Sequence, residues 1–411
     1  MEQVTKLEKI LGRIGELNAK GYKPVTLFAA CPNSVAVVKA AFRAAKRNNA
    51  PIIFAATLNQ IDCDGGYTGM TQEDFVRTAR EEAGRSGYQG DYIIAIDHGG
   101  PWLKDIQRIE KWPYEKAMAA VKRSYEAAVT AGYDMIHVDP TVDINVPKGE
   151  IIKIEVVAQR TVELISHIEK FRKSKGLPRI SYEVGTEEVH GGLADEAVFD
   201  RFLHLLKAGL EREGCSDAWP KFIVGKVGTD LHTTFFDSKV ARDLADKVRP
   251  YGSFIKGHYT DDVSNPEEYP LAGMGAANVG PEFTVCEYDA LEELENREKK
   301  LYDENRVATL SKMTEVLERL VIDSGRWKKW ILPGESSDDF SSIGAERRRW
   351  LIRTSARYIW QSPEAMAARW KLYGNMEENG IDAEHIVSSG IEKNMDKYYR
   401  AFNLIDLNNY L

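Results

Sequence analysis

The stretch Tyr92-Ile93-Ile94-Ala95-Ile96-Asp97-His98 combines the two features that decide the fold. Its first five residues are apolar and mostly β-branched or aromatic, which predicts a buried strand, whereas its last two are polar side chains suited to chemistry. An amphipathic segment at residues 114–130 follows and predicts a helix. A strand that ends in polar groups and is followed by a helix is the unit of parallel α/β folds.

The same unit recurs on both sides of this stretch, from residue 24 to about residue 280. Eight apolar runs lie at residues 25–29, 52–56, 92–96, 135–138, 180–184, 222–225, 253–256 and 276–279. Helical candidates lie between them at residues 34–47, 114–130, 155–173, 196–213 and 238–247. Eight strands are the number that a (β/α)8 barrel requires, although a doubly wound open sheet gives the same alternation.

Polar residues follow nearly every apolar run, and this pattern favours the barrel. These residues are Asn33, Asn59, Gln60, Asp97, His98, Asp139, Glu187, Asp230, His232, Lys256, His258 and Asn278. A barrel brings all eight strand ends to one mouth, the face at which such folds carry their active sites. Chance accounts for polar loop residues at one or two strand ends but poorly for eight. We therefore predict an α/β fold with a (β/α)8 barrel over residues 1–284.

The pattern changes to successive helices beyond Glu282, with candidates at residues 288–305, 307–320 and 362–373. Ser362 and Pro363 suit the cap and the first position of the last of these helices. Basic and aromatic residues interleave here, a pattern that can bind single-stranded nucleic acid but in an acidic chain favours packing and subunit contacts. We predict that residues 285–411 form a helical extension packed on the barrel.

Composition excludes several classes of protein. The 411 residues carry a formal net charge of -8 with no continuous basic stripe, so no nucleic-acid partner is predicted. The four cysteines form no CxxC pair, as expected of reduced thiols. No apolar run approaches about 18 residues, and no basic segment followed by an apolar stretch opens the chain. We therefore expect a cytoplasmic protein without membrane association.

Three histidines, His98, His232 and His258, follow three different predicted strands. Imidazoles that converge with a carboxylate suit zinc or a similar cation and leave a position open for substrate. The close spacing of established zinc motifs is missing, so the pattern does not specify the metal. For His137 a hydrogen-bonded structural role is favoured over a ligand role.

Asp97 directly precedes His98, and a frayed strand end can present both side chains to one site. One residue can then hold the metal while the other moves a proton. Asp139 and Asp261 are further acid–base candidates, although Asp139 also fits a turn.

Nucleotide cofactors are not predicted. The glycine-rich segment at residues 62–71, in which Thr71 and Asp74 suit a helix cap, fits a shaped active-site loop or a structural turn. The sequence has no GxxxxGK[ST] motif, and residues 273–278 lack the third glycine and the preceding strand of a dinucleotide fingerprint.

Seven short strings follow one another in a specific order. They are Asn59-Gln60, residues 65–71, Asp97-His98-x-Gly100-Pro101, Ile136-His137-x-Asp139, Gly185-Thr186-Glu187, His258-x-Thr260-Asp261 and Val279-Gly280-Pro281-x-x-Thr284. Together they resemble the non-catalytic (Z-type) subunits of class II D-tagatose-bisphosphate aldolases. The resemblance spans residues 30–284 and, faintly, Trp327-Lys328-Lys329-Trp330 and Arg357-Tyr358-Ile359-Trp360. It implies a TIM barrel related to class II aldolases, in a family of accessory subunits and metal-dependent ketose or ketose-phosphate 4-epimerases.

The resemblance also implies roles for individual residues. Asp97 resembles the acid that handles the hydroxyl proton, with Glu187 or Asp139 as a second carboxylate. Metal ligands are predicted at His98, Glu187, His232 and His258, of which His232 matches least well. Substrate contacts are predicted for Asn33, Asn59, Gln60, Thr68, Lys256, Asp261, Asn278 and Gly280. The expected cation is zinc, with Mn, Co and Ni as alternatives.

The first functional hypothesis is inversion of C4 of a ketohexose or its phosphate by metal-assisted retro-aldol and aldol steps. The alternative is a non-catalytic subunit that stabilises a separate tagatose-bisphosphate aldolase. We accordingly expect a homo-oligomer, or a hetero-oligomer with that aldolase. Glu282 departs from the family, because a carboxylate in the first turn of the helix after strand eight would repel a phosphate there. Whether the substrate is phosphorylated therefore stays open at this point.

Overall fold

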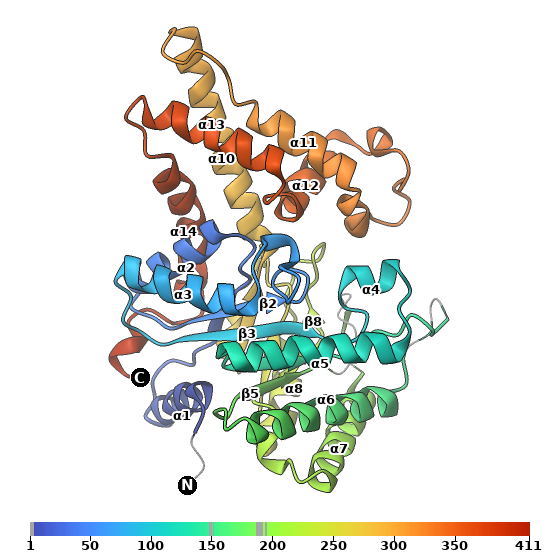
Figure 1. The fold of residues 1–411 in the computed structure, drawn as a ribbon. Helices are drawn as coiled ribbons and strands as arrows, with labels where there is room; N and C mark the ends of the chain where they lie inside the picture. The colour runs from blue at the N-terminus through green and yellow to red at the C-terminus, as the bar shows by residue number, and fades with distance from the viewer. Residues whose placement is uncertain (1–3, 148–149, 151, 186–191, 194) are drawn as a thin grey trace.

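Eight parallel strands close into a barrel in the computed structural model, which describes residues 4–147, 150, 152–185, 192–193 and 195–411 (Figure 1). The barrel strands are β1 (Leu27–Ala30), β2 (Ile52–Thr57), β3 (Tyr92–Gly99), β4 (Met135–Val138), β5 (Ser181–Val184), β7 (Phe222–Val224), β9 (Phe254–Gly257) and β10 (Ala276–Val279). They neighbour one another in chain order, and β10 pairs with β1 to close the ring. The predicted barrel is confirmed and the doubly wound sheet is excluded.

Helices surround the barrel as the alternating pattern predicts. They are α2 (Val35–Arg47), α3 (Gln72–Ser86), α4 (Asp105–Ile109), α5 (Tyr114–Ala131), α6 (Ile154–Ser174), α7 (Glu196–Arg212), α8 (Ser238–Val248) and α9 (Glu268–Leu271). A short antiparallel pair, β6 (Gly192–Leu193) and β8 (Val227–Gly228), lies outside the barrel sheet. Helix α1 (Lys6–Ala19) lies at the end of the barrel where the strands begin. There Thr5, its N-cap, contacts Ser181 at the start of β5.

Local sequence signals set the loops that follow β1 and β2. Ser34 accepts a hydrogen bond from the Val37 N–H and caps α2. Thr71 and Asp74 form the capping box expected at the start of α3. Between them Gly66 has φ +52°, and a Cβ there would lie 2.3 Å from the Gln60 carbonyl oxygen. Only glycine therefore allows this turn to pack against the residues that follow β2.

The helical extension rises from the mouth of the barrel and returns to it (Figure 1). It contains α10 (Pro281–Asp303), α11 (Met313–Ser324), α12 (Ala345–Ser355), α13 (Pro363–Glu377) and α14 (Ala383–Ala401). Helix α14 runs back along α2, where Glu392 pairs with Arg47 at 2.5 Å. The helix predicted at 307–320 begins later, at Met313, because Ser311 is held by the Glu298 carboxylate of α10. The proposed domain boundary after residue 284 falls within α10, and the division into two domains stays a proposal.

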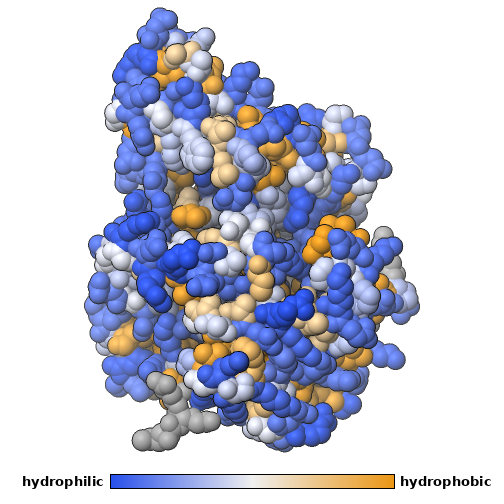
Figure 2. All heavy atoms as spheres, in the orientation of Figure 1, coloured by the Kyte–Doolittle hydropathy of each residue, from blue (hydrophilic) through white to orange (hydrophobic). Residues whose placement is uncertain are grey.

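The surface in Figure 2 is largely hydrophilic, with apolar side chains scattered over it rather than gathered into a band. Among the described helices, none combines the length and the apolar character needed to cross a membrane.

Candidate active site

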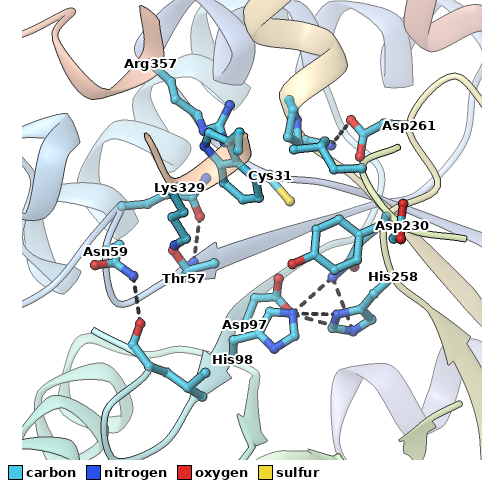
Figure 3. Close-up of a pocket in the computed structure, with 18 of the residues that line it drawn as sticks. Cys31, Thr57, Asn59, Asp97, His98, Asp230, His258, Asp261, Lys329 and Arg357 are labelled. Carbon is cyan, nitrogen blue, oxygen red and sulfur yellow. Dashed lines mark hydrogen bonds and ion pairs between the residues drawn. The ribbon is translucent and has the colours of Figure 1, made fainter. Parts of the chain in front are cut away.

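A cavity of about 650 Å³ opens at the carboxyl ends of the barrel strands (Figure 3). The turns η4 (Arg326–Trp330) and η6 (Ala356–Tyr358) of the helical extension form its other wall. The predicted site residues in its lining are Asn33, Asn59, Gln60, Asp97, His98, Asp139, His232, His258, Asp261, Asn278 and Gly280. The cavity thus lies at the mouth where the polar strand ends were expected to converge.

An irregular end to β3 places both Asp97 and His98 at the cavity. The register between β3 and β4 shifts between Ile96 and Gly99, and His98 has φ +47°. In a regular strand, neighbouring side chains point to opposite faces, and the irregularity removes that constraint. A non-glycine residue at positive φ is strained, and such strain is concentrated at functional sites.

The imidazole rings of His98 and His258 face each other, and each ring is hydrogen-bonded to a carboxylate through its far nitrogen. The His98 Nδ1 atom lies 2.6 Å from Asp139 Oδ2, and the His258 Nε2 atom lies 2.8 Å from Glu183 Oε1. The remaining nitrogens, His98 Nε2 and His258 Nδ1, are 2.8 Å apart. A carboxylate that binds one ring nitrogen fixes the tautomer and directs the other nitrogen toward a metal. This pair therefore has the arrangement of two oriented metal ligands.

A fully buried layer beneath this pair completes the cluster. His137 on β4 stands beside Glu183 on β5, and both side chains are completely buried. The His137 Nδ1 atom accepts a hydrogen bond from the His98 N–H, and its Nε2 atom is buried without a hydrogen-bond partner. Lys256 pairs with the Glu183 carboxylate at 2.7 Å, and the Asn278 amide donates to Asp97 Oδ1 at 3.0 Å. These contacts hold the side chains beneath the cavity in fixed positions.

The cluster carries more negative than positive charge. Three carboxylates, Asp97, Asp139 and Glu183, face one ammonium group, that of Lys256. Burial opposes a charge on His98, yet Asp97 and Asp139 raise the pKa of its ring to about 9. His98 therefore carries a proton near neutral pH in the metal-free cluster, and a divalent cation that displaced this proton would balance the three carboxylates together with Lys256.

The pKa values of the neighbouring groups follow from the same charges. Burial and the charges of His98 and Lys256 lower the pKa of His258 to about 4. Despite burial, the His98 hydrogen bond lowers the pKa of Asp139 to about 2, and Lys256 lowers that of Glu183 to about 2. His258 is therefore neutral and the carboxylates are ionised near neutral pH, which are the states that bind a metal.

These features fit a divalent cation. Ligand atoms of His98, His137 and His258 lie within 4.8 Å of one another, as do those of Asp97, His137, Glu183 and His258. Nitrogen and oxygen donors of this kind suit Zn and other first-row cations. A bound cation would balance the excess negative charge and occupy the space that the two facing imidazole nitrogens share.

Of the four predicted metal ligands, His232 does not join this group and Glu187 cannot be placed relative to it. His232 is exposed at the cavity rim, and its ring contacts Trp350 with centroids 5.2 Å apart. It lies outside both groups of potential ligands. The chain after β7 pairs through β8 before it reaches His232, so His232 does not directly follow a barrel strand. Glu187 lies outside the described residues, so its predicted ligand and catalytic roles stay predictions.

Two predicted substrate contacts also lie away from the cavity wall. The Thr68 hydroxyl is buried and donates to the Gln60 carbonyl oxygen at 2.7 Å. Lys256 is completely buried and is engaged by Glu183. The structure thus gives both residues contacts within the protein, whereas Asn33, Asn59, Gln60 and Asn278 do line the cavity.

Asp261 occupies the amino end of α10. Its Oδ1 atom accepts hydrogen bonds from the N–H groups of Gly280 and Glu282, at 2.9 and 2.8 Å. Glu282 is buried beside it, where it accepts hydrogen bonds from Asp262 N–H and the Tyr398 hydroxyl. Burial and the charge of Glu282 raise the pKa of Asp261 to about 7. The backbone donors that a phosphate would use are therefore already engaged by a carboxylate.

Sequence reasoning missed two groups of residues at the site, one buried beneath the cavity and one in its wall. His137 was assigned a structural role and Glu183 was not singled out, since both lie within strands and resemble core positions. The other group consists of Lys329, Trp330, Arg357 and Tyr358 from the helical extension. These four belong to the two tail strings with family counterparts, and that likeness was the available signal.

Comparison with known proteins agrees with this architecture. Residues 14–403 match the family described as D-tagatose-1,6-bisphosphate aldolase subunit GatZ/KbaZ-like, and the chain belongs to that family. A curated relative, the D-tagatose 6-phosphate 4-epimerase of Agrobacterium fabrum, is 27% identical over 372 residues, which cover 84% of this chain and 83% of the relative.

Solved structures share the fold at lower sequence identity. A probable tagatose 6 phosphate kinase from Sinorhizobium meliloti 1021 has a TM-score of 0.75 and 23% identity, over 92% of this chain and all of that one. The fructose-bisphosphate aldolase of Campylobacter jejuni has a TM-score of 0.57 and 11% identity, over 97% of this chain and 95% of that one. The predicted likeness to the aldolase barrels is thus confirmed at the level of the fold.

Proposed function

We propose that this chain is a metal-dependent 4-epimerase that interconverts the tagatose and fructose forms of a ketohexose phosphate. The observation that carries the proposal is the pair of facing imidazoles, each backed by a carboxylate, beside Asp97 at the barrel mouth. The name of the Agrobacterium fabrum relative supports the choice of substrate and reaction.

Inversion at C4 requires that the C3–C4 bond break and form again on the other face of C4. Asp97 takes the proton from the C4 hydroxyl, the C3–C4 electron pair passes into the fragment that contains C1 to C3, and C4 becomes an aldehyde. His98 and His258, with His137 or a carboxylate of the cluster, would hold a divalent cation, which when bound would supply positive charge to the fragment that receives the C3–C4 electron pair. The aldehyde then rotates, the bond re-forms, and Asp97 returns the proton to the new hydroxyl.

Other residues orient these groups. The Asn278 amide binds Asp97 Oδ1 and fixes the plane of the carboxylate. Both Asp139 oxygens are engaged, one by His98 and the other by the Thr141 hydroxyl at 2.6 Å. This arrangement supports a positioning role for Asp139 rather than the acid–base role that the sequence also allowed.

The second candidate function is the non-catalytic subunit, because the matching family is described as an aldolase subunit. An accessory protein needs no proton acceptor next to a pair of oriented imidazoles in an open cavity. The cluster therefore supports the enzyme more strongly.

The test uses the isolated chain, loaded with Zn²⁺, Mn²⁺, Co²⁺ or Ni²⁺ and offered ketohexose 6-phosphates and free ketohexoses. We expect interconversion of fructose and tagatose forms that stops on chelation and returns with the cation. A metal-loaded chain that is inert toward every ketose, yet raises the activity or stability of an added tagatose-bisphosphate aldolase, would establish the accessory function instead.

Two further predictions need separate measurements. Light scattering of the same preparation tests the predicted homo-oligomer, and cell fractionation tests the cytoplasmic location.

A further inference from the structure

Arg357 is a buried guanidinium without an anionic partner. It is 4% exposed, lines the cavity, and donates to the Thr354 carbonyl oxygen and, at 3.1 Å, to the Tyr358 hydroxyl. Its guanidinium lies over the rings of Trp330 and Tyr358. Within the described part of the chain it forms no ion pair with any carboxylate, and the charge of Asp261 acts on it only from beyond ion-pair distance. Burial of a charge without a counter-charge is costly, so this position favours an anion from outside the protein.

More positive charge surrounds Arg357. Lys329, Arg108 and Arg326 share a single carboxylate, Asp105, with Lys329 Nζ and Arg108 Nη2 at 3.1 and 3.3 Å from Oδ1. Lys329 and Arg108 also line the cavity. Although burial opposes ionisation, the charges of Arg357, Lys329 and Arg326 hold the pKa of the Tyr358 hydroxyl below its usual value. This wall of the cavity therefore carries a net positive charge.

The site at which such barrels commonly bind a phosphate is occupied by protein groups in this chain. In such folds the helix that follows the last strand presents its N–H groups to the anion. Here Asp261 accepts hydrogen bonds from the Gly280 and Glu282 N–H groups, and the Glu282 carboxylate lies beside it. Glu282 also pairs with Lys397, so its charge is partly balanced. The N–H groups that a substrate anion would use are nevertheless already occupied by Asp261.

The cationic residues and the imidazoles lie on different sides of the cavity. Figure 3 shows Arg357 and Lys329 on one side and His98 and His258 on the other. The proposed chemistry involves C2, C3 and C4 of the ketose, whereas a terminal phosphate or carboxylate is carried on C6. A substrate with its reacting carbons at the imidazoles thus directs its C6 group away from them.

We propose that Arg357 and Lys329 form a subsite, contributed by the helical extension, for the terminal oxyanion of the substrate. The proposal rests on the proposed function for the identity of that substrate. Arg presents a planar fork that binds phosphate or carboxylate oxygens in pairs, and Lys adds a point charge. The same anchor has a second effect, because C6 belongs to the aldehyde fragment. Arg357 retains that fragment while it rotates, which disfavours its escape as a triose.

The test compares Arg357→Gln with the native chain and with Arg319→Gln, which removes an exposed cation of α11 remote from the cavity. Loss of a charge-assisted hydrogen bond predicts a fall in kcat/KM of about 10–100-fold for an anionic ketose. Turnover of the free ketose, which offers Arg357 no anion, should fall clearly less than turnover of the anionic ketose. Triose release per epimerisation should rise. Parallel assays with a ketohexose 6-phosphate and a ketohexuronate tell which oxyanion the subsite takes.

Binding of inorganic phosphate, measured by calorimetry, supplies a readout that does not depend on turnover. We expect the native chain and Arg319→Gln to bind phosphate and Arg357→Gln to bind it at least about tenfold more weakly. If Arg357→Gln does not fold, Lys329→Gln is measured in its place, with a smaller loss expected. Equal losses on neutral and anionic ketoses, or unchanged phosphate binding, would overturn the subsite. A native chain that binds phosphate through Arg357 but turns over no ketose would contradict the proposed function and leave the subsite standing.

Discussion

The barrel and the helical extension meet at one cavity and contribute opposite charges to it. The barrel contributes Asp97, Asp139 and Glu183 with their imidazoles, in a layer that is almost wholly buried. The extension contributes Lys329 and Arg357, on short 3-10 turns. An excess of negative charge attracts a cation, and an excess of positive charge attracts an anion. In the proposed function, the mouth of the barrel supplies the chemistry and the helical extension binds the far end of the substrate.

The largest expected effect is loss of the cation from the barrel end. His258→Ala removes one of the two facing imidazoles, so metal content should fall from about one per chain to a small fraction. The matched control is His167→Ala, since His167 pairs with Glu126 on the outer helices and lies outside the cavity. Elemental analysis of the purified variants gives the answer. Full stoichiometric metal in His258→Ala would refute the ligand assignment.

The next effect separates proton transfer from metal binding at the barrel side of the cavity. Asp97→Asn keeps the shape of the side chain but removes its basicity, so the rate should fall by about 10²–10⁴-fold with metal retained. Asp143→Asn is the control, because Asp143 pairs with Arg160 away from the cavity. Steady-state rates and metal content are measured on the same samples. An Asp97→Asn enzyme of native rate would remove Asp97 from the mechanism.

A third effect tests how firmly α10, the helix that leads out of the barrel, is held against α13 within the extension. Glu287 of α10 is completely buried and pairs with Arg369 of α13 at 2.7 Å, while the Ser34 hydroxyl at the start of α2 donates to its other oxygen. Arg369→Ala leaves this carboxylate buried without its partner and should lower the free energy of unfolding by about 3–5 kcal/mol. Arg319→Ala, which breaks an exposed pair with Glu364, should cost about 0–1 kcal/mol. Denaturant titration distinguishes the two, and equal costs would argue against a buried ion pair between α10 and α13.

The smallest expected effect concerns the amino end of α10. Glu282→Gln removes a negative charge from the position at which barrels commonly bind phosphate, but the Asp261 carboxylate still accepts both N–H groups. If the substrate anion binds at Arg357, kcat/KM for a ketohexose phosphate should change by less than about threefold. A large gain in Glu282→Gln would instead place the anion at α10.

The sequence predicts the barrel well because each strand and helix has its own periodicity and each strand ends in polar residues. It also places Asp97, His98 and His258 at one mouth, since that follows from closure of the barrel alone. Glu183 and His137 escape prediction because their chemistry depends on the register between β4 and β5, which sets them side by side inside the barrel. No local pattern distinguishes such a residue from an ordinary core position.

The far wall of the cavity is beyond local prediction for a different reason. Arg357 lies in a basic and aromatic turn that equally suits packing, and only the return of the extension over the mouth directs it inward. His232 shows the reverse case. Its place after a predicted strand suggested a metal ligand, but its ring contacts Trp350 instead. Both outcomes depend on loop paths, which the sequence pattern does not determine.

The most direct test of the central claim follows the hydrogen on C4 during turnover in D2O. The metal-loaded chain is incubated with a ketohexose 6-phosphate, and the product is examined by NMR. Cleavage and re-formation of the C3–C4 bond leave the C4 hydrogen in place, so the account predicts interconversion of tagatose and fructose forms with protium at C4. Deuterium at C4, or no interconversion by the metal-loaded chain, would contradict it.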